Sequence, residues 1–241
     1  NLLSYGCFNN YKDLGTLYVD PLVYINSSIQ AFDPAGISEE IEYSWYSYET
    51  SDSKPVQSVP EEDMTKPQAY SWVKAARYKG FPFEVGPLAR QWLSGEYRHG
   101  ISTMDRVIAR VLEAEKITEV MEVLLQNLIP NISVQKEYVI PETAEGAGLI
   151  DTTRGALGHW LKISNNHISF YQVITPSGWN LSTRSGNLKG TAEQALISTA
   201  IHNTENPAEL GRIVRSFDPC VSCATHVYSQ GRHIKTIKVM P

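Results

Sequence analysis

Apolar residues recur at helical spacing in one long stretch near the middle of the chain. The positions, at intervals of three and four residues, are Met104, Val107, Ile108, Val111, Leu112, Met121, Leu124, Leu125 and Leu128. Such a stripe is typical of a helix that buries one face. Ser102 or Thr103 can cap its start, and Pro130 ends it. We therefore predict helical structure over residues 103–128, in which the part of the stripe from Met121 onward belongs to a further helix or follows a small break, and we expect the stripe to lie in the core.

An alternating pattern farther along the chain predicts a β-hairpin over residues 160–174. Asn165 and Asn166 lie between its two strands and tolerate the positive φ that a tight turn needs. Glycines crowd the flanking sequence, which indicates either an irregular loop region or backbone that passes close to a ligand or another chain. Weaker patterns predict short strands within 16–32, helices over 191–203 and about 209–214, and a polar surface excursion over about 49–69.

Composition narrows the class of protein only moderately. The 241 residues are 42% hydrophobic and 20% charged, which is typical of an ordinary globular protein with one large domain or two small ones. No apolar run reaches the roughly 18 residues of a membrane-spanning helix. The net charge of -5 and the lack of a basic run argue against a nucleic-acid surface. The apolar opening Asn1-Leu-Leu is unlike a natural start and suggests a fragment.

Candidate chemistry lies close to the C-terminus, where Cys220, Cys223 and His226 follow one another at three-residue intervals. On a turn that enters a helix, this spacing directs both thiolates to one metal, and thiolates prefer soft or borderline ions. Pro219 can open such a helix, which would place Cys220 near its N-terminus and favour the thiolate. The alternatives are a surface pair without metal and half of a structural zinc site. Cys7 stands alone and is expected to be a buried small residue.

The sequence around these cysteines has a wider resemblance. The segment Ser216-Phe-Asp-Pro-Cys-Val-Ser-Cys-Ala-Thr-His226 is similar to the C-terminal signature of nickel–iron hydrogenase large subunits. Further similar segments occur in family order from about Trp45 onward: Tyr70-Ser-Trp-Val-Lys-Ala-Ala-Arg-Tyr-Lys-Gly80, Glu84-Val-Gly-Pro-Leu-Ala-Arg90, Arg154-Gly-Ala-Leu-Gly-His-Trp160 and Tyr171-Gln-Val-Ile-Thr-Pro-Ser-Gly-Trp-Asn180. The resemblance implies a mainly α fold with small antiparallel β elements (α+β) around a helical-bundle core, with residues 1–226 as the C-terminal half of a large subunit.

The resemblance also implies roles for individual residues. Cys220 would be a terminal thiolate on nickel, and Cys223 would bridge nickel and iron. Arg154 would stand over the open coordination position and pair with Asp218. The remaining implied roles are those of Pro176 and Ser177, beside the cyanide and carbon monoxide ligands of the iron, and of His226 and the Val173 carbonyl, as ligands of magnesium or another divalent cation.

Three features depart from the family pattern. The family takes two further thiolates from a second cysteine pair near its own N-terminus, and this chain has no such pair. Residues 227–241 extend beyond the ligating histidine and resemble an extension that a maturation protease removes. Thr153 stands where the family usually has proline before the arginine, which affects the loop conformation and not the role of Arg154.

The resemblance implies reversible heterolytic cleavage of dihydrogen into protons and electrons at a nickel–iron centre. Implied partners are an iron–sulfur small subunit, the missing N-terminal half of the large subunit and the maturation protease, with no nucleic acid. The implied location is periplasmic or membrane-associated through the small subunit, with the cytoplasm as an alternative. Other readings are a hydrogen sensor with the same site and a zinc-binding interaction domain. A non-catalytic respiratory-complex relative is disfavoured because such subunits lack the cysteines.

Overall fold

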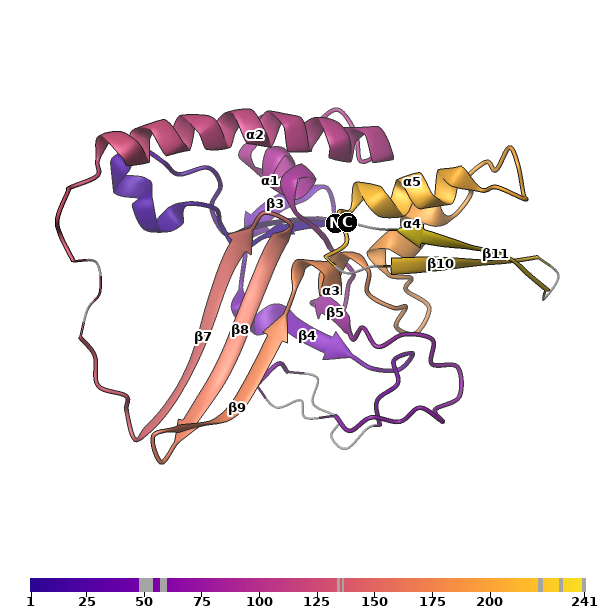
Figure 1. Cartoon of the computed structure of the whole chain (residues 1–241), viewed down its shortest axis with the longest axis horizontal. Coiled ribbons are helices and arrows are strands. Elements are labelled where there is room, and N and C mark those ends of the chain that lie inside the picture. Colours follow the sequence, from indigo (N-terminus) through magenta and orange to yellow (C-terminus); the bar gives the residue numbers. More distant parts are fainter. Residues whose placement is uncertain are drawn as a thin grey trace.

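A computed structural model describes residues 1–47, 54–56, 60–133, 135 and 137–220, together with the backbone of residues 223–229 and 232–239. Within these ranges the chain combines one long helix with several small sheets (Figure 1). The α+β class is therefore confirmed, but the fold is not mainly α, because strands take up about as much of the described chain as helices do, and the expected helical bundle is not seen in it. Buried side chains of the sheets and short helices, and not of packed long helices, form the largest core cluster, which includes Leu3, Phe83, Trp160 and Trp179.

A four-stranded sheet joins the start of the chain to its middle. Its strands run in the order β3-β2-β1-β6. Their bounds are Leu2–Ser4 for β1, Leu22–Ile25 for β2, Ser28–Ala31 for β3 and Glu84–Val85 for β6. β1 pairs in antiparallel fashion with β2 and in parallel with β6. The strands expected within residues 16–32 are thus found in part, since Val19 makes only an isolated bridge with Cys7.

A three-stranded antiparallel sheet forms a long curved arm (Figure 1). It consists of β7 (Thr143–Thr152), β8 (Gly155–Ser164) and β9 (His167–Ile174). The predicted hairpin is confirmed, and Asn165 and Asn166 have the positive φ values of 52° and 60° that its turn requires. β7 was not predicted, because its glycines and exposed positions hide the alternation of a strand.

The long helix α2 spans Thr103–Gln126 and confirms the predicted helix. It begins with a capping box, in which the Ser102 side chain accepts a hydrogen bond from the Asp105 N–H and Asp105 accepts one from the Ser102 N–H. The expectation that the apolar stripe lies in the core is wrong for this chain. Met104, Val111 and Leu125 are exposed, as are most of the stripe's other members, because α2 turns its opposite face inward.

The remaining elements connect these parts. They are the 3₁₀ helices η1 (Asn9–Leu14) and η2 (Pro34–Gly36), the strand pair β4 (Ile37–Glu40) and β5 (Ala75–Tyr78), and the helices α1 (Pro87–Ser94), α3 (Pro176–Asn180), α4 (Thr191–Leu196) and α5 (Ala208–Ser216). The prediction at 191–203 is therefore too long, and that at 209–214 is confirmed. Of the expected excursion, residues 49–53 and 57–59 lie outside the described residues, and the described parts form turns and loops without a helix.

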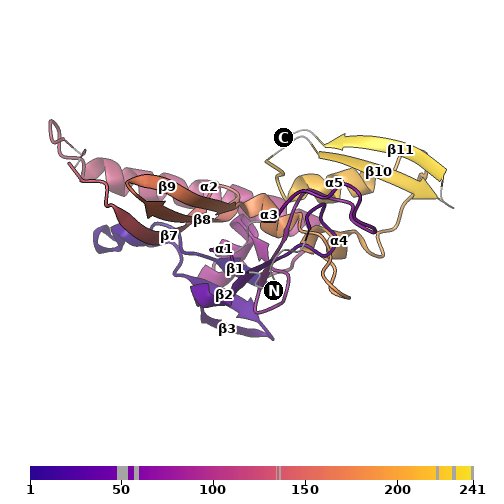
Figure 2. The same cartoon turned by 90° about the horizontal axis from the view of Figure 1, so that it is seen from below.

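The chain ends in a separate two-stranded antiparallel hairpin of β10 (Cys223–Ser229) and β11 (Arg232–Val239). Seen from below, this hairpin extends past α5, at the opposite end of the molecule from β7, β8 and β9 (Figure 2). The prediction that the segment after Pro219 enters a helix is wrong, because the described backbone from Cys223 onward is the strand β10.

Candidate functional site

Arg154 occupies the tight turn between β7 and β8, which two glycines hold against the start of α1. Gly155 and Gly86 have φ values of +124° and +117°, in the region that favours glycine. A Cβ on Gly155 would lie 2.5 Å from the Gly86 nitrogen, and one on Gly86 would lie 2.8 Å from the Arg154 carbonyl oxygen. The two backbones therefore meet without intervening side chains, so the close approach at Gly155 is to another part of this chain, whereas the predicted approach to a ligand or another chain stays a prediction.

Arg154 faces Asp218, which follows α5. The Arg154 Nε lies 3.1 Å from Asp218 Oδ2 and donates to the Asp218 carbonyl at 3.0 Å. The predicted ion pair is thus present. The side chains are 34% and 31% exposed in this chain, so the pair lies at the surface of the described residues.

The backbone at Asp218 directs its carboxylate toward the arginine. Asp218 has a φ of 52°, and its N–H donates to the Arg215 carbonyl at 2.9 Å, so it ends the helix in a left-handed conformation. Aspartate adopts this conformation more readily than most residues other than glycine. Phe217, just before it, is buried and packs under the Arg106 guanidinium at 3.9 Å from the ring centroid.

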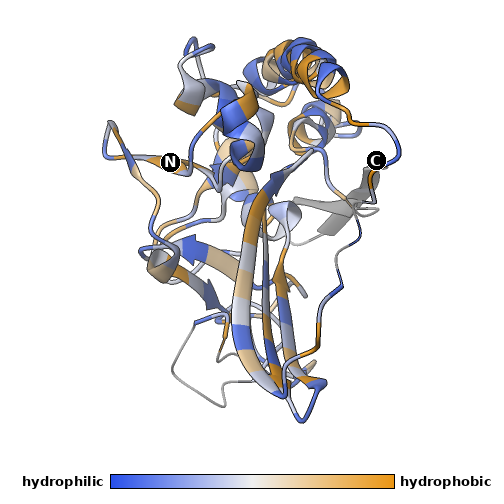
Figure 3. Ribbon diagram, turned by 90° about the vertical axis from the view of Figure 1, so that its left-hand side faces the viewer, coloured by the Kyte–Doolittle hydropathy of each residue, from blue (hydrophilic) through white to orange (hydrophobic). Residues whose placement is uncertain are grey.

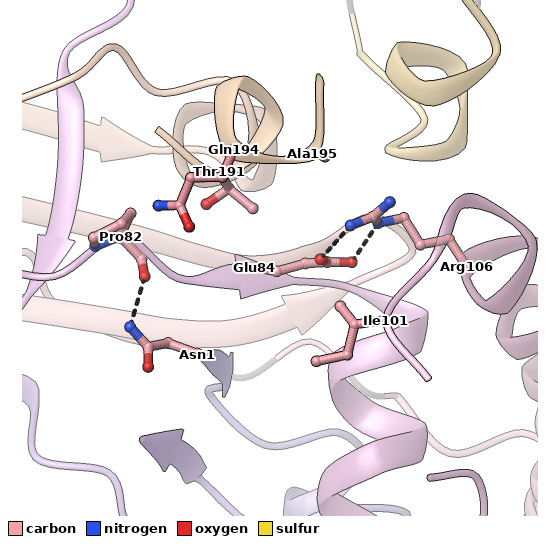
Figure 4. Close-up of a pocket in the computed structure, with 8 residues that line it drawn as sticks. All are labelled: Asn1, Pro82, Glu84, Ile101, Arg106, Thr191, Gln194 and Ala195. Carbon is pink, nitrogen blue, oxygen red and sulfur yellow. Dashed lines mark hydrogen bonds and ion pairs between the residues drawn. The ribbon is translucent and has the colours of Figure 1, made fainter. Parts of the chain in front are cut away.

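Arg106 is in turn fixed by Glu84 of β6. The Arg106 Nε and Nη2 donate to the two Glu84 carboxylate oxygens at 2.8 and 2.9 Å. Figure 4 shows this paired arrangement at the edge of a cavity of about 300 Å³. A bidentate buried pair restricts both side chains. Glu84, Arg106 and Phe217 therefore form a rigid support on the side of α5 where Asp218 turns.

A second contact joins the predicted site residues of α3 to Cys220. Thr175 caps α3, Pro176 occupies its first turn and is buried, and the Ser177 hydroxyl accepts a hydrogen bond from the Cys220 N–H at 3.1 Å. The Cys220 thiol is exposed. Ser177 and Cys220, which are 43 positions apart in sequence, thus lie side by side.

Ser177 and Cys220 also line a cavity of about 420 Å³ together with Val173 of β9. The same cavity contains Glu39 and Lys74, which were not predicted. Glu39 Oε2 lies 3.5 Å from the Lys74 Nζ and accepts a hydrogen bond from Gln172 Nε2 at 2.5 Å. Burial raises the pKa of Glu39, while the Lys74 charge and the Gln172 hydrogen bond act in the opposite direction.

The polar group formed by Glu39, Lys74 and Gln172 could not be recognised from the sequence. Glu39 lies in an ordinary acidic run, Ser-Glu-Glu, and Gln172 occupies a strand position with no motif chemistry of its own. Their meeting depends on the packing of β9 beside β4 and β5, which sequence periodicity does not give. Lys74 lies inside one of the segments that carry the family resemblance, and this was the only available signal.

The other cysteines differ in environment. Cys7 is buried, as predicted, and burial raises the pKa of its thiol to about 12, so the thiol stays protonated at neutral pH. The side chains of Cys223 and His226 lie outside the described part of the structure. Among the described residues, no group of three or more His, Cys, Asp or Glu side chains is placed to hold a metal ion. Cys220 is therefore the one described thiol that is accessible to a metal.

These features define an α+β domain in which an accessible cysteine and an aspartate follow the same helix, and the aspartate pairs with an arginine from the turn between β7 and β8. The chain belongs to the nickel-dependent hydrogenase family, whose sequence profile matches residues 1–100 and 93–226. It is 32% identical to the periplasmic [NiFeSe] hydrogenase large subunit of Desulfomicrobium baculatum, over 94% of this chain and 49% of that protein. It is 31% identical to the uptake hydrogenase large subunit of Rhodobacter capsulatus, over 99% of this chain and 50% of that protein.

Solved structures give the same result for the fold. The reduced, active [NiFeSe] hydrogenase of D. baculatum superimposes with a TM-score of 0.83 and 31% identity, over 91% of this chain and 50% of that one. The reduced enzyme of D. vulgaris Hildenborough gives a TM-score of 0.81 and 30% identity, over 91% and 51%. The chain thus spans about half the length of the relatives it matches. No helix in the described ranges is long and apolar enough to span a membrane.

Proposed function

We propose that this chain forms the nickel-binding half of a hydrogenase large subunit that catalyses reversible heterolytic cleavage of dihydrogen to protons and electrons. The observation that carries the proposal is the placement of Cys220 and the Arg154–Asp218 pair at the end of one helix. Family membership indicates which metal the site would bind, because the family and a relative are named as nickel-dependent and [NiFeSe] hydrogenases.

The donor set of the chain fits half of such a centre. Cys220 would supply a terminal thiolate to nickel and Cys223 a thiolate that bridges nickel and iron, because soft thiolates suit these metals. Cys7 does not fit, since its thiol is buried and its pKa is about 12. When bound, the nickel–iron centre would supply the Lewis acidity and redox chemistry of the reaction.

Ser177 and Pro176 are proposed to serve the iron side of the centre. The Ser177 hydroxyl accepts from the Cys220 N–H, which leaves its proton free to donate to a ligand such as cyanide. Carbon monoxide would lie against the apolar ring of Pro176. We further propose that His226 and the Val173 carbonyl hold magnesium or another divalent cation, with the cavity of Glu39 and Lys74 beside it.

The Arg154–Asp218 pair is proposed to act on the reacting hydrogen. An arginine keeps its charge at all physiological pH values and holds its donors in a fixed plane. Asp218 fixes that plane from one side through Nε, and the terminal nitrogens would be the groups that act on the hydrogen. Opposite charges held at this spacing stabilise the charge separation that develops as dihydrogen is split.

The missing half of the large subunit is the first proposed partner. The outward face of α2 carries exposed apolar side chains, among them Met104, Val111 and Leu125. Figure 1 shows α2 along one edge of the molecule, and Figure 3 shows it nearly end-on at the top. A large exposed apolar face is costly in water and is typical of an interface. We propose that helices of the remaining half cover this face and complete a helical-bundle core.

An iron–sulfur small subunit would then receive the electrons. A low-potential cluster held by protein needs several cysteines, and the three in this chain are too few for both centres. The proposed location follows that of the relatives, one of which is named as periplasmic, with membrane association through the small subunit.

Residues 227–241 are proposed to be a maturation extension that a protease removes after His226. The supporting observation is that the backbone of β11 pairs along the whole of β10, including Thr225 with Ile237 and His226 with Thr236. The extension therefore ties the ligand-bearing segment into a hairpin. Intact mass measurement of the active enzyme tests this step, and a full-length C-terminus on the active species would contradict it.

The experiment that tests the function compares metal content across cysteine variants of the complete large subunit. We expect nickel and iron in the parent protein and loss of nickel in Cys220→Ala and Cys223→Ala. Cys7→Ala is the matched control, and it should keep its nickel. Zinc in place of nickel in the parent protein would instead favour a zinc-binding interaction domain, and normal nickel in all variants would refute the assigned ligands.

A further inference from the structure

A buried ionic cluster lies directly behind the turn that carries Arg154. It is formed by Arg90 of α1, Glu113 of α2 and Asp151 of β7, whose side chains are 1%, 10% and 0% exposed. The hydrogenase proposal gives these residues no role. Burying three charged groups costs desolvation free energy unless ion pairs and hydrogen bonds offset it. The partners of each group in the cluster are therefore informative.

Every N–H of the Arg90 guanidinium donates a hydrogen bond, and two of these bonds go to the turn before Arg154. Its Nε and Nη2 donate to the two Glu113 carboxylate oxygens at 2.6 and 2.5 Å, and its Nη1 donates to Asp151 Oδ2 at 3.1 Å. The remaining two bonds go to the carbonyl oxygens of Thr152 at 2.9 Å and Thr153 at 3.1 Å. Arginine has five N–H donors, and each has a partner here.

Asp151 connects the cluster to the opposite side of the core. Its carboxylate accepts hydrogen bonds from the Ser4 hydroxyl at 2.8 Å and from the Tyr5 N–H at 2.9 Å. The Arg90 guanidinium therefore joins α1, α2 and β7, and Asp151 links this cluster to β1. Within the turn, the guanidinium donates to the two carbonyls that precede Arg154.

We infer that Arg90 is a positioning residue that fixes the backbone before Arg154 and so sets where the Arg154 guanidinium stands against Asp218. Thr152 and Thr153 carry no ring that restricts φ, so hydrogen bonds to their carbonyls limit the motion of the turn. The Gly86–Gly155 contact holds the other side of the same turn. The catalytic consequence of this inference rests on the proposed function, whereas the placement of the turn does not.

Substitution by lysine separates positioning from charge. Lysine keeps the positive charge, but its single nitrogen cannot serve two carboxylates and two carbonyls at once. Arg77→Lys is the matched control, because Arg77 is equally buried and donates to the Thr183 carbonyl and the Ser182 hydroxyl, away from the Arg154 turn. If Arg90→Lys fails to fold, the neutral set Arg90→Met with Glu113→Gln and Asp151→Asn removes the anchor without leaving an unpaired buried charge.

The first measurement is amide hydrogen exchange of residues 152–156 in the full chain, which needs no metal and no activity. We expect exchange to accelerate by about tenfold or more in Arg90→Lys and to stay at the parent rate in Arg77→Lys, since exchange follows local opening of the turn. Equal exchange in the two variants would overturn the inference, whatever the protein catalyses.

The second measurement is a double-mutant cycle in the complete hydrogenase. We expect Arg90→Lys to lower kcat by roughly tenfold or more at unchanged nickel content, and to cause almost no further loss when Arg154 is already lysine. Equal fold losses in both backgrounds would show that Arg90 does not act through Arg154, and would refute the catalytic part. A parent enzyme without hydrogen turnover would refute the proposed function instead, and the exchange comparison would still decide the inference.

Discussion

At the scale of single residues, burial separates two cysteines that look alike in the sequence. Cys7 has a raised pKa because it is desolvated, and the charge of Arg90 lowers that pKa only in part. Cys220 is exposed beside Ser177. The thiolate is the reactive and metal-binding form of cysteine. The same chemical group therefore serves packing at one position and is free to react at the other.

Alkylation of the folded, metal-free chain tests this difference. At pH 8, a thiol with a pKa of about 12 is ionised in roughly one molecule in ten thousand. We expect N-ethylmaleimide to label Cys220 rapidly and Cys7 at least about a hundredfold more slowly. Labelling of Cys7 should increase as the pH is raised toward 12, because ionisation then becomes possible. Peptide mass mapping gives both rates, and a urea-unfolded sample, in which both sites should react alike, is the control.

Asp218 combines a backbone role with a charge role, and two substitutions separate them. Asparagine tolerates the left-handed conformation at φ 52°, so Asp218→Asn should unfold at nearly the parent urea concentration. Asp218→Ala should lose about 1 kcal/mol more, because alanine is strained there. Both should lower hydrogen turnover of the complete enzyme by about tenfold or more, since both remove the partner of Arg154. Full turnover in Asp218→Asn would exclude a role for the carboxylate.

At the scale of elements, the sequence predicted structure well where local chemistry decides it. The Asn165–Asn166 turn and the start of α2 at Ser102 follow from residues that satisfy local backbone requirements, and both are found as expected. The course of the chain after Pro219 was predicted wrongly, because the spacing of two cysteines does not by itself fix the secondary structure that follows them. Pairing with β11, a contact between segments, decides the outcome there.

The candidate site likewise contains contacts that the sequence could predict and contacts that it could not. The pairing of Arg154 with Asp218 could be expected, because the resemblance covers both residues. The cluster at Arg90 and the polar group at Glu39 could not, because each joins residues from three segments that are separated in sequence. No periodicity or motif encodes such a meeting before the fold is known.

The capping box of α2 gives a prediction at this scale. The Ser102 hydroxyl accepts from the Asp105 N–H at 3.2 Å, and Ser102→Ala removes this bond from an exposed helix end. We expect a loss of about 1 kcal/mol in the free energy of unfolding. Urea denaturation followed by circular dichroism measures it. Thr118→Ala, on an exposed middle turn of the same helix, is the control and should change stability by less than about 0.5 kcal/mol.

At the scale of the whole molecule, α2 has an unusual orientation. Its buried residues include the charged Arg106 and Glu113, each held by an ion pair, whereas long apolar side chains point outward. The inward charges are fixed by specific partners, so the helix cannot rotate to bury its stripe without breaking both pairs. The exposed face is thus a stable property of this half, and we expect another part of the protein to use it.

Substitutions on that face should affect association and not folding. Val111 is 67% and Leu125 68% exposed, so replacing each by serine should change the free energy of unfolding of this chain by less than about 0.5 kcal/mol. The same changes should weaken co-purification with a separately expressed N-terminal half of the large subunit. Glu115→Ser, on the same exposed side of α2, is the matched control. Unchanged co-purification of the double variant would contradict the proposed interface.

The hairpin of β10 and β11 has a consequence for how maturation would proceed. After a protease cut behind His226, the released peptide with β11 could diffuse away. The remaining part of β10, Cys223–His226, would then have unpaired amide and carbonyl groups along its edge. An isolated strand of this kind is not stable in water. The segment would therefore have to pair elsewhere or change its secondary structure. Peptide-bond hydrolysis is not reversed in the cell, so the change in the Cys223 segment would become irreversible. The protease, and not the folding of the chain, would then set when this change occurs.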